Sequence, residues 1–215
     1  MNTLDHLQPS FFGTDEAFEK LKNSERSSIL VVSDSHGNSS ALCDVIRNRG
    51  KSCDGFCFCG DGLSDVAECF SMASTDPDLK TAIPPCVVAV CGNCDYRTEF
   101  FFTNLSINSD QKRAEFSDFA TFFASGFKIL ITHGLCHEPY SCINRLHPLG
   151  EAHNAEIVLF GHTHIPEFTQ KDGITFINPG SLTSPRGKTF QPQVAILNLE
   201  KGKIPRWEPI SHPHH

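Results

Sequence analysis

The sequence predicts an α/β protein with mixed β-sheets and helices on the outside. In the first half, short apolar strands alternate with helical segments, while in the second half strands follow one another with little helix between them. The 215 residues suffice for one domain with a substantial core, because domains typically contain about 100–200 residues. Short buried strands separated by helices are typical of parallel βαβ units, whose sheets are covered on both faces.

Residues 1–26 are expected to be an N-terminal extension of the main domain. Phe12, Phe18 and Leu21 are spaced to line one side of a short helix. Thr14 offers an N-cap, and acidic residues follow it in the first turn, as is usual at helix starts. The extension is therefore predicted to pack a short helix on the domain.

The main domain is predicted over residues 27–205 and begins with three strands that alternate with two helices. The strands are predicted at 28–33, 55–59 and 86–90, and the helices at 39–49 and 64–72. The first strand is rich in β-branched residues, and the first helix stops at a glycine, Gly50.

The second half of the domain is predicted to consist mainly of strands. Segments 116–123 and 127–132 are separated by Ala124-Ser125-Gly126, which suits a hairpin, and further strands are predicted at 157–160, 174–177 and 194–197. Residues 206–215 are expected to form a flexible tail that is rich in histidine, because chain ends are usually poorly ordered.

Composition excludes some classes of function. The formal charge of −7 argues against a large nucleic-acid surface, which requires a basic patch. No apolar run approaches the roughly 20 residues that span a bilayer, and the N-terminus lacks the basic and apolar regions of a signal peptide. We therefore expect a cytoplasmic protein whose ten cysteines are reduced thiols.

A phenylalanine-rich stretch extends from residue 100 to residue 127. It has two interpretations. The first is core packing of the predicted hairpin. The second is a subunit interface of a homo-oligomer, because aromatic side chains are enriched at interfaces.

Polar side chains follow five of the predicted strands, at the point where each strand ends. They are Asp34 and His36, Asp61, Asn93, His133, and the pair His162 and His164. In open α/β sheets the carboxyl ends of the strands form the edge where ligands bind. Each motif taken alone has a structural explanation as a turn or a hydrogen-bonded residue, but five strand ends in succession indicate one shared site.

The residue types indicate a metal centre. Carboxylate oxygens and imidazole nitrogens together suit divalent ions such as manganese, zinc or iron. Seven ligands are too many for one four-coordinate zinc ion with an open position, and they fit two ions that share a bridging carboxylate.

These motifs closely resemble those of the calcineurin-like metallophosphoesterase superfamily. The Asp-x-His, Gly-Asp, Gly-Asn-Cys-Asp, His and Gly-His-x-His signatures lie at residues 34–36, 60–61, 92–95, 133 and 161–164. The resemblance extends from about residue 28 to 200, and segments 92–95 and 178–181 look like the YfcE-like phosphodiesterase branch. It implies a four-layer α/β/β/α fold in which two mixed sheets form a sandwich flanked by helices.

The resemblance also implies a division of the ligands between two divalent metal ions. One ion would be bound by Asp34, His36, Asp61 and His164, and the other by Asp61, Asn93, His133 and His162, with Asp61 bridging. Asp61, Asn93 and His133 are the expected catalytic residues. Manganese is the expected metal, with nickel, cobalt, zinc, iron and magnesium as alternatives.

The expected reaction is hydrolysis of a small phosphodiester. Two ions about 3.5–4 Å apart can hold a bridging hydroxide for in-line attack on phosphorus. Many superfamily members carry a histidine that protonates the leaving group where this chain has Cys94, so good leaving groups are expected to be preferred. The alternatives are a phosphomonoesterase or nucleotidase, a non-catalytic scaffold like the retromer subunit of this fold, and a redox pair formed by Cys91 and Cys94.

Histidine ligands need further hydrogen-bond partners that fix their tautomers. Asp65 and Asp95 lie close to the ligand motifs in the sequence and are candidates for this role, although both could equally be surface carboxylates.

Overall fold

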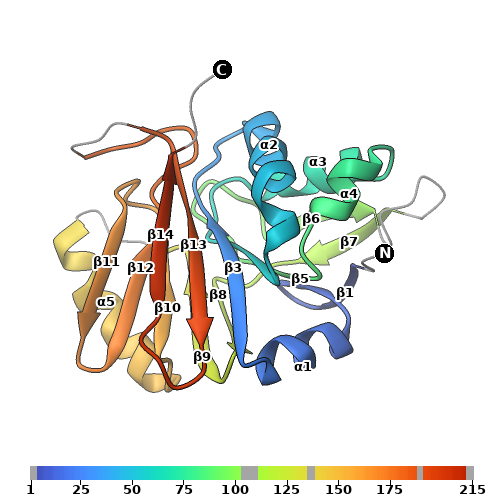
Figure 1. Cartoon of the computed structure of the whole chain (residues 1–215). Helices are drawn as coiled ribbons and strands as arrows, with labels where there is room; N and C mark the ends of the chain where they lie inside the picture. The colour runs from blue at the N-terminus through green and yellow to red at the C-terminus, as the bar shows by residue number, and fades with distance from the viewer. Residues whose placement is uncertain (1–3, 103–110, 135–138, 188–190, 212–215) are drawn as a thin grey trace.

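The structure is a computed structural model that describes residues 4–102, 111–134, 139–187 and 191–211. It has four layers: helices, a first sheet, a second sheet and a further helix. Figure 1 shows α2, α3 and α4 together on one side of the molecule and α5 on the opposite side. Within the described ranges, no helix has the length and apolar character required to cross a membrane.

The first sheet has seven strands in the order β1-β2-β5-β4-β3-β13-β14. Their bounds are β1 (Asp5–Gln8), β2 (Phe11–Gly13), β3 (Arg26–Val32), β4 (Gly55–Phe58), β5 (Cys86–Ala89), β13 (Gln193–Glu200) and β14 (Arg206–Ser211). Strands β3, β4 and β5 are parallel and are connected through α2 (Ser39–Arg49), α3 (Leu63–Ala73) and α4 (Pro77–Ala82), with a short 3₁₀ turn (Gly50–Ser52) after α2. The outer strands pair antiparallel.

The second sheet has five strands in the order β11-β12-β10-β9-β8. Their bounds are β8 (Phe119–Ala124), β9 (Phe127–Thr132), β10 (Ile157–Leu159), β11 (Glu167–Lys171) and β12 (Ile174–Asn178). Strands β9, β10 and β12 are parallel, and α5 (Pro139–Ala152) lies between β9 and β10 in the chain. A separate hairpin, β6 (Thr98–Phe102) and β7 (Gln111–Glu115), lies beside α3.

Side-chain alternation along the strands explains the layers. In β3, Leu30 and Val32 pack with the helices of the first layer, while Ile29 and Val31 pack between the two sheets. Successive strand residues point to opposite faces of a sheet, so a strand buried on both faces is apolar throughout. The second sheet repeats this pattern, and its outer face packs against α5. The expected mixed two-sheet α/β fold is confirmed.

The predicted elements of the main domain form close to their expected bounds. The hairpin of β8 and β9 turns at Ser125 and Gly126, whose φ angles are 47° and 82°. Two central residues with positive φ are typical of the tight turns that match the twist of antiparallel strands.

The N-terminal segment forms more structure than expected. The predicted helix is α1 (Asp15–Asn23), where the Thr14 hydroxyl accepts a hydrogen bond from the Ala17 amide at 3.1 Å. Phe12, however, lies in β2, so the segment before the helix adds two strands to the first sheet. These strands have only four and three residues, too few for a periodic pattern.

The expectation of a flexible tail from residue 206 is wrong for residues 206–211, which form the edge strand β14 paired with β13. Residues 212–215 lie outside the described residues. Sequence patterns also missed α4, β6, β7, β11 and α5. Helix α5 contains Pro148, a residue that normally interrupts helices and so obscures the pattern.

The expectation of reduced thiols is wrong for one pair of cysteines. Cys43 of α2 and Cys69 of α3 form a disulfide, with Cα atoms 5.7 Å apart. The other cysteines in the described part of the chain are free, including Cys91 and Cys94.

Candidate metal centre

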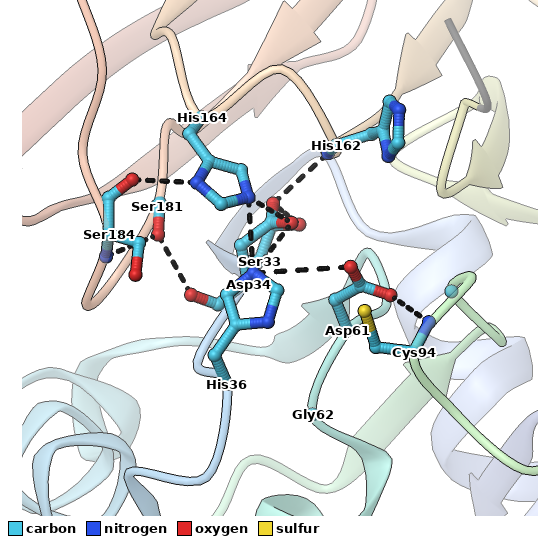
Figure 2. Close-up of polar contacts among 12 residues, drawn as sticks. Ser33, Asp34, His36, Asp61, Gly62, Cys94, His162, His164, Ser181 and Ser184 are labelled. Atoms are coloured by element: carbon cyan, nitrogen blue, oxygen red, sulfur yellow. Dashed lines mark hydrogen bonds and ion pairs between the residues drawn. The ribbon is translucent and has the colours of Figure 1, made fainter. Parts of the chain in front are cut away.

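The predicted ligand residues converge at the carboxyl ends of the parallel strands, on loops from both sheets. Figure 2 shows Asp34, His36, Asp61, His162 and His164 around one region. The loops after β3, β4 and β5 of the first sheet carry Asp34 and His36, Asp61, and Asn93, while β9 and β10 of the second sheet lead into His133, and into His162 and His164.

The backbone at most of these positions is unusual. Residues other than glycine rarely adopt positive φ angles, and such strained residues cluster at functional sites. Five of the predicted ligands have φ angles between 45° and 66°, namely Asp34, His36, Asp61, His162 and His164. Sequence analysis did not detect this strain, because nothing in a residue's own type requires it.

Two glycines permit the loops to approach each other. A Cβ atom at Gly92 would collide with the carboxylate and amide of Asp61, and one at Gly161 would collide with Ser33 and Asp34. Glycine is therefore required where loops from different strands meet at the site.

A first cluster contains Asp34, His36 and His164, whose ligand atoms lie within 4.8 Å of one another. The Asp34 Oδ1 atom is 3.1 Å from His164 Nε2 and 3.7 Å from His36 Nε2, and the two Nε2 atoms are 3.1 Å apart. Asp34 is fully buried, and its Oδ1 accepts no hydrogen bond. Its Oδ2 accepts hydrogen bonds from the Ser33 hydroxyl and the His162 amide.

A second cluster contains Asp61, His133 and His162, again within 4.8 Å of one another. The His133 Nε2 atom lies 3.4 Å from Asp61 Oδ2, 3.2 Å from His162 Nδ1 and 3.1 Å from Asn93 Oδ1. The Asn93 amide nitrogen faces the sulfur of Cys94, so its oxygen is directed into the cluster.

Asp61 lies between the two clusters. Its Oδ2 is 3.4 Å from His133 Nε2 and 4.0 Å from His36 Nε2, while its Oδ1 accepts a hydrogen bond from the Cys94 amide at 2.8 Å. Burial alone would raise the pKa of Asp61, but His133 and the Cys94 amide outweigh burial and hold this pKa well below its ordinary value. Asp61 is therefore charged and placed to serve both clusters.

Main-chain carbonyls orient two of the imidazoles. His133 Nδ1 donates to the Cys59 carbonyl at 2.7 Å, and His164 Nδ1 donates to the Ser184 carbonyl at 2.6 Å. A neutral imidazole that donates through Nδ1 has an acceptor lone pair on Nε2. In their neutral form both rings therefore have an Nε2 atom free to bind a metal ion on the side of the carboxylates.

Asp95 has a different role from the one considered in the sequence analysis. Its Oδ1 accepts from the amides of Gly62 and Leu63, and its Oδ2 accepts from those of Asp61 and Gly92, at 2.8–2.9 Å. Asp95 therefore fixes the Asp61 loop, and no hydrogen bond joins it to an imidazole in the described part of the chain.

Asp65 likewise supports a loop. Its carboxylate accepts hydrogen bonds from the Ser35 hydroxyl and, at 2.9 Å, from the Gly37 amide. These contacts hold the segment on either side of His36.

The donor set fits divalent cations. Acceptor atoms face one another at 3.1–3.7 Å in the first cluster, with one buried carboxylate oxygen that accepts no hydrogen bond. Such an arrangement is unfavourable unless a positive charge lies between the acceptors. Burial lowers the pKa of His133, but the nearby carboxylates of Asp61 and Asp34 outweigh burial and raise it.

Carboxylates and imidazoles gather at the carboxyl ends of the strands in this two-sheet α/β fold. This combination is typical of metal-binding α/β proteins. Residues 28–202 match the calcineurin-like phosphoesterase superfamily domain. The chain belongs to this superfamily, which confirms the resemblance seen in the sequence.

Relatives with similar sequences carry names that agree. The probable metallophosphoesterase YsnB of Bacillus subtilis is 29% identical over 172 residues, covering 80% of this chain and 84% of the relative. Phosphodiesterase YfcE of Escherichia coli is 26% identical over 101 residues, covering 47% of each chain.

Solved structures share the fold at low sequence identity. A Streptococcus pneumoniae protein described as a predicted phosphoesterase has a TM-score of 0.59 and 21% identity, with 88% of this chain and 99% of that chain covered. Vacuolar protein sorting 29 from Cryptosporidium parvum has a TM-score of 0.58 and 18% identity, with 88% and 100% covered. At these identities the likeness concerns the fold alone.

Proposed function

We propose that this chain is a phosphodiesterase that uses two divalent metal ions, manganese foremost, to hydrolyse a small phosphodiester. The observation that carries the proposal is the convergence of the His36 and His164 Nε2 atoms on Asp34 Oδ1, a fully buried oxygen that accepts no hydrogen bond. The family and the names of the relatives support a phosphoesterase activity.

Each predicted ligand has a part in this proposal. Asp34, His36 and His164 would hold one ion; Asn93, His133 and His162 would hold the other; and Asp61 would bridge them. When bound, the ions supply the Lewis acid that activates water and neutralises charge on the phosphoryl oxygens during in-line displacement.

The residues around the ligands prepare the site. The Cys59 and Ser184 carbonyls fix the tautomers of His133 and His164, so that these rings need not reorient when an ion binds. Asp95 fixes the loop that carries Asp61. Asp61, Asn93 and His133 form the proposed catalytic group. Asn93 and His133 border the cavity described below, where substrate would enter, and Asp61 Oδ2 lies 3.4 Å from His133 Nε2.

Cys94 occupies the position next to Asn93 where a leaving-group acid is expected in many relatives. Burial and the nearby Asp61 carboxylate raise the pKa of the Cys94 thiol, which makes it a weak proton donor. We therefore expect the rate to depend steeply on the leaving-group pKa across a series of aryl phosphodiesters. The substitution Cys94→His should flatten this dependence, and an unchanged slope would refute the role of the position.

The test of the proposal is hydrolysis of bis-p-nitrophenyl phosphate by chelator-treated protein to which Mn²⁺ is restored. The expected result is turnover only with metal, with two ions bound per chain by elemental analysis. A pure scaffold, the alternative supported only by the shared fold of vacuolar protein sorting 29, would give no turnover with any of Mn²⁺, Ni²⁺, Co²⁺, Zn²⁺ or Mg²⁺. Faster turnover of p-nitrophenyl phosphate than of the diester would instead favour a phosphomonoesterase.

A further inference from the structure

A cavity of about 360 Å³ opens beside the candidate metal centre, and we name it the side pocket. Asn93 and His133 line one part of it, while Arg97, Asp118 and Arg145 line another. Its volume lies within the range of about 300–1,000 Å³ that is usual for small-molecule sites. A substrate whose phosphate lies at the metal centre can therefore place one of its ester groups in the side pocket.

The charges in the side pocket are mostly compensated. Arg97 is paired with Asp118 at 2.7 Å. Asp95, which also lines the side pocket, accepts four main-chain hydrogen bonds with its two carboxylate oxygens. These three side chains already have partners within the protein.

Arg145 is the exception. It is an exposed residue of α5, and no carboxylate lies within 4.0 Å of its guanidinium among the residues that the structure describes. Of the described residues that line the pocket, Gly134 and Leu146, the latter next to Arg145 in the sequence, carry no charge. A guanidinium without a carboxylate partner among the described residues is suited to a second phosphate, because its planar fork binds phosphate oxygens in pairs.

We propose that Arg145 selects phosphodiesters in which one of the two esterified alcohols carries a further phosphate group. This inference rests on the proposed phosphodiesterase function and names its substrate class. The scissile phosphate would lie at the metal centre, and the second phosphate would lie in the side pocket against Arg145. The reaction remains hydrolysis: water adds to phosphorus, the ester P–O bond breaks, and the alcohol leaves with a proton.

The test compares two chromogenic substrates that differ by one phosphate, thymidine 5′-(p-nitrophenyl phosphate) and its 3′-phosphorylated form. Both release p-nitrophenol, so the chemical step is the same. A charge-assisted bidentate contact corresponds to about a ten- to hundredfold preference in kcat/KM for the 3′-phosphorylated substrate. The preference is expected in KM, and it should decline as ionic strength rises.

The variants are Arg145→Gln and, as the matched control, Arg97→Gln, since both arginines line the same pocket but only Arg97 is already paired. Arg145→Gln should abolish the preference, and Arg145→Lys should retain part of it. In Arg97→Gln, the ratio of the two kcat/KM values should stay within about twofold of the ratio in the unmodified protein. Equal losses on both substrates in Arg145→Gln, or no preference in the unmodified protein, would overturn the inference while leaving the phosphodiesterase function intact. Absence of turnover of both substrates and of bis-p-nitrophenyl phosphate would instead overturn the proposed function itself.

Discussion

The two sheets contribute different halves of the candidate metal centre. The first sheet supplies both carboxylates together with His36 and Asn93, and the second sheet supplies the other three imidazoles. The carboxylate half is held in place by side chains: Asp95 fixes the Asp61 loop, and Asp65 supports the loop of His36. In the imidazole half, His133 and His164 are held by main-chain carbonyls.

This difference indicates which substitutions should disturb the centre. A main-chain carbonyl persists whatever side chain its residue carries, so substitutions at Cys59 or Ser184 leave the hydrogen bond in place. The carboxylate half instead depends on single side chains behind the ligands.

The largest effect is expected for Asp61→Asn, because this residue lies between the two clusters. Loss of this negative charge would weaken the binding of both proposed ions, which are the groups that would stabilise the transition state by several kcal/mol. The kcat with bis-p-nitrophenyl phosphate should therefore fall about a thousandfold. The exposed Asp78→Asn is the matched control and should keep full activity. Two ions bound per chain in Asp61→Asn with normal kcat would contradict the bridging position.

The next largest effect is expected for Asp95→Asn, which weakens three hydrogen bonds to the Asp61 loop and one to Gly92. Metal affinity should fall by about 10- to 100-fold, the usual effect of removing a group that supports metal ligands. Titration with Mn²⁺ measures this. Asp54→Asn is the control, because Asp54 accepts a hydrogen bond from the Ser28 amide away from the site. If Asp95→Asn bound metal normally, the contrast between the two halves would fail.

Gly161→Ala tests the point where the two halves meet. The added methyl group would collide with Ser33 and Asp34, and overpacking of this kind usually costs about 1–3 kcal/mol. Urea denaturation should show this loss of unfolding free energy together with weaker metal binding. In the control Gly55→Ala, the new Cβ would lie 3.6 Å from Ile29, an ordinary contact, so a comparable loss there would refute the steric explanation.

The smallest effect is expected for His6. This residue lies in β1, at the edge of the first sheet, and other strands separate it from β3. Burial lowers the pKa of His6, and the opposing contribution of Glu115 does not compensate. The unfolded chain therefore binds more protons at this residue, and stability should decline as the pH falls from about 6.5 through the lowered folded pKa.

The variant His6→Phe keeps an aromatic ring against Phe12 and removes the titration. Thermal unfolding between pH 7.5 and 5 should therefore show a shallower decline in Tm for His6→Phe than for the unmodified protein. Identical slopes in the two proteins would show that His6 does not contribute to acid sensitivity.

Much of the fold could be predicted from the sequence because its signals are local. Short, largely apolar segments marked β3, β4, β5, β9 and β10, and a cap at Thr14 marked α1. The strands β1, β2 and β14 could not be predicted, because they are short or half-exposed. Strand β2 is placed by pairing with the distant strand β5, and β1 and β14 form hairpins with β2 and β13. Helix α5 escaped detection because of its internal proline.

The order of residues along the chain shows which side chains follow each strand, and in an α/β fold this suffices to predict that they share one edge. The folded structure was needed to show that Asp61 lies between the two clusters, that Asp95 supports its loop, and that Arg145 borders the same cavity as His133. The physical reason is the range of the interactions. Periodicity and capping act within a few residues, whereas hydrogen bonds between loops and the lining of a cavity join residues that are tens of positions apart.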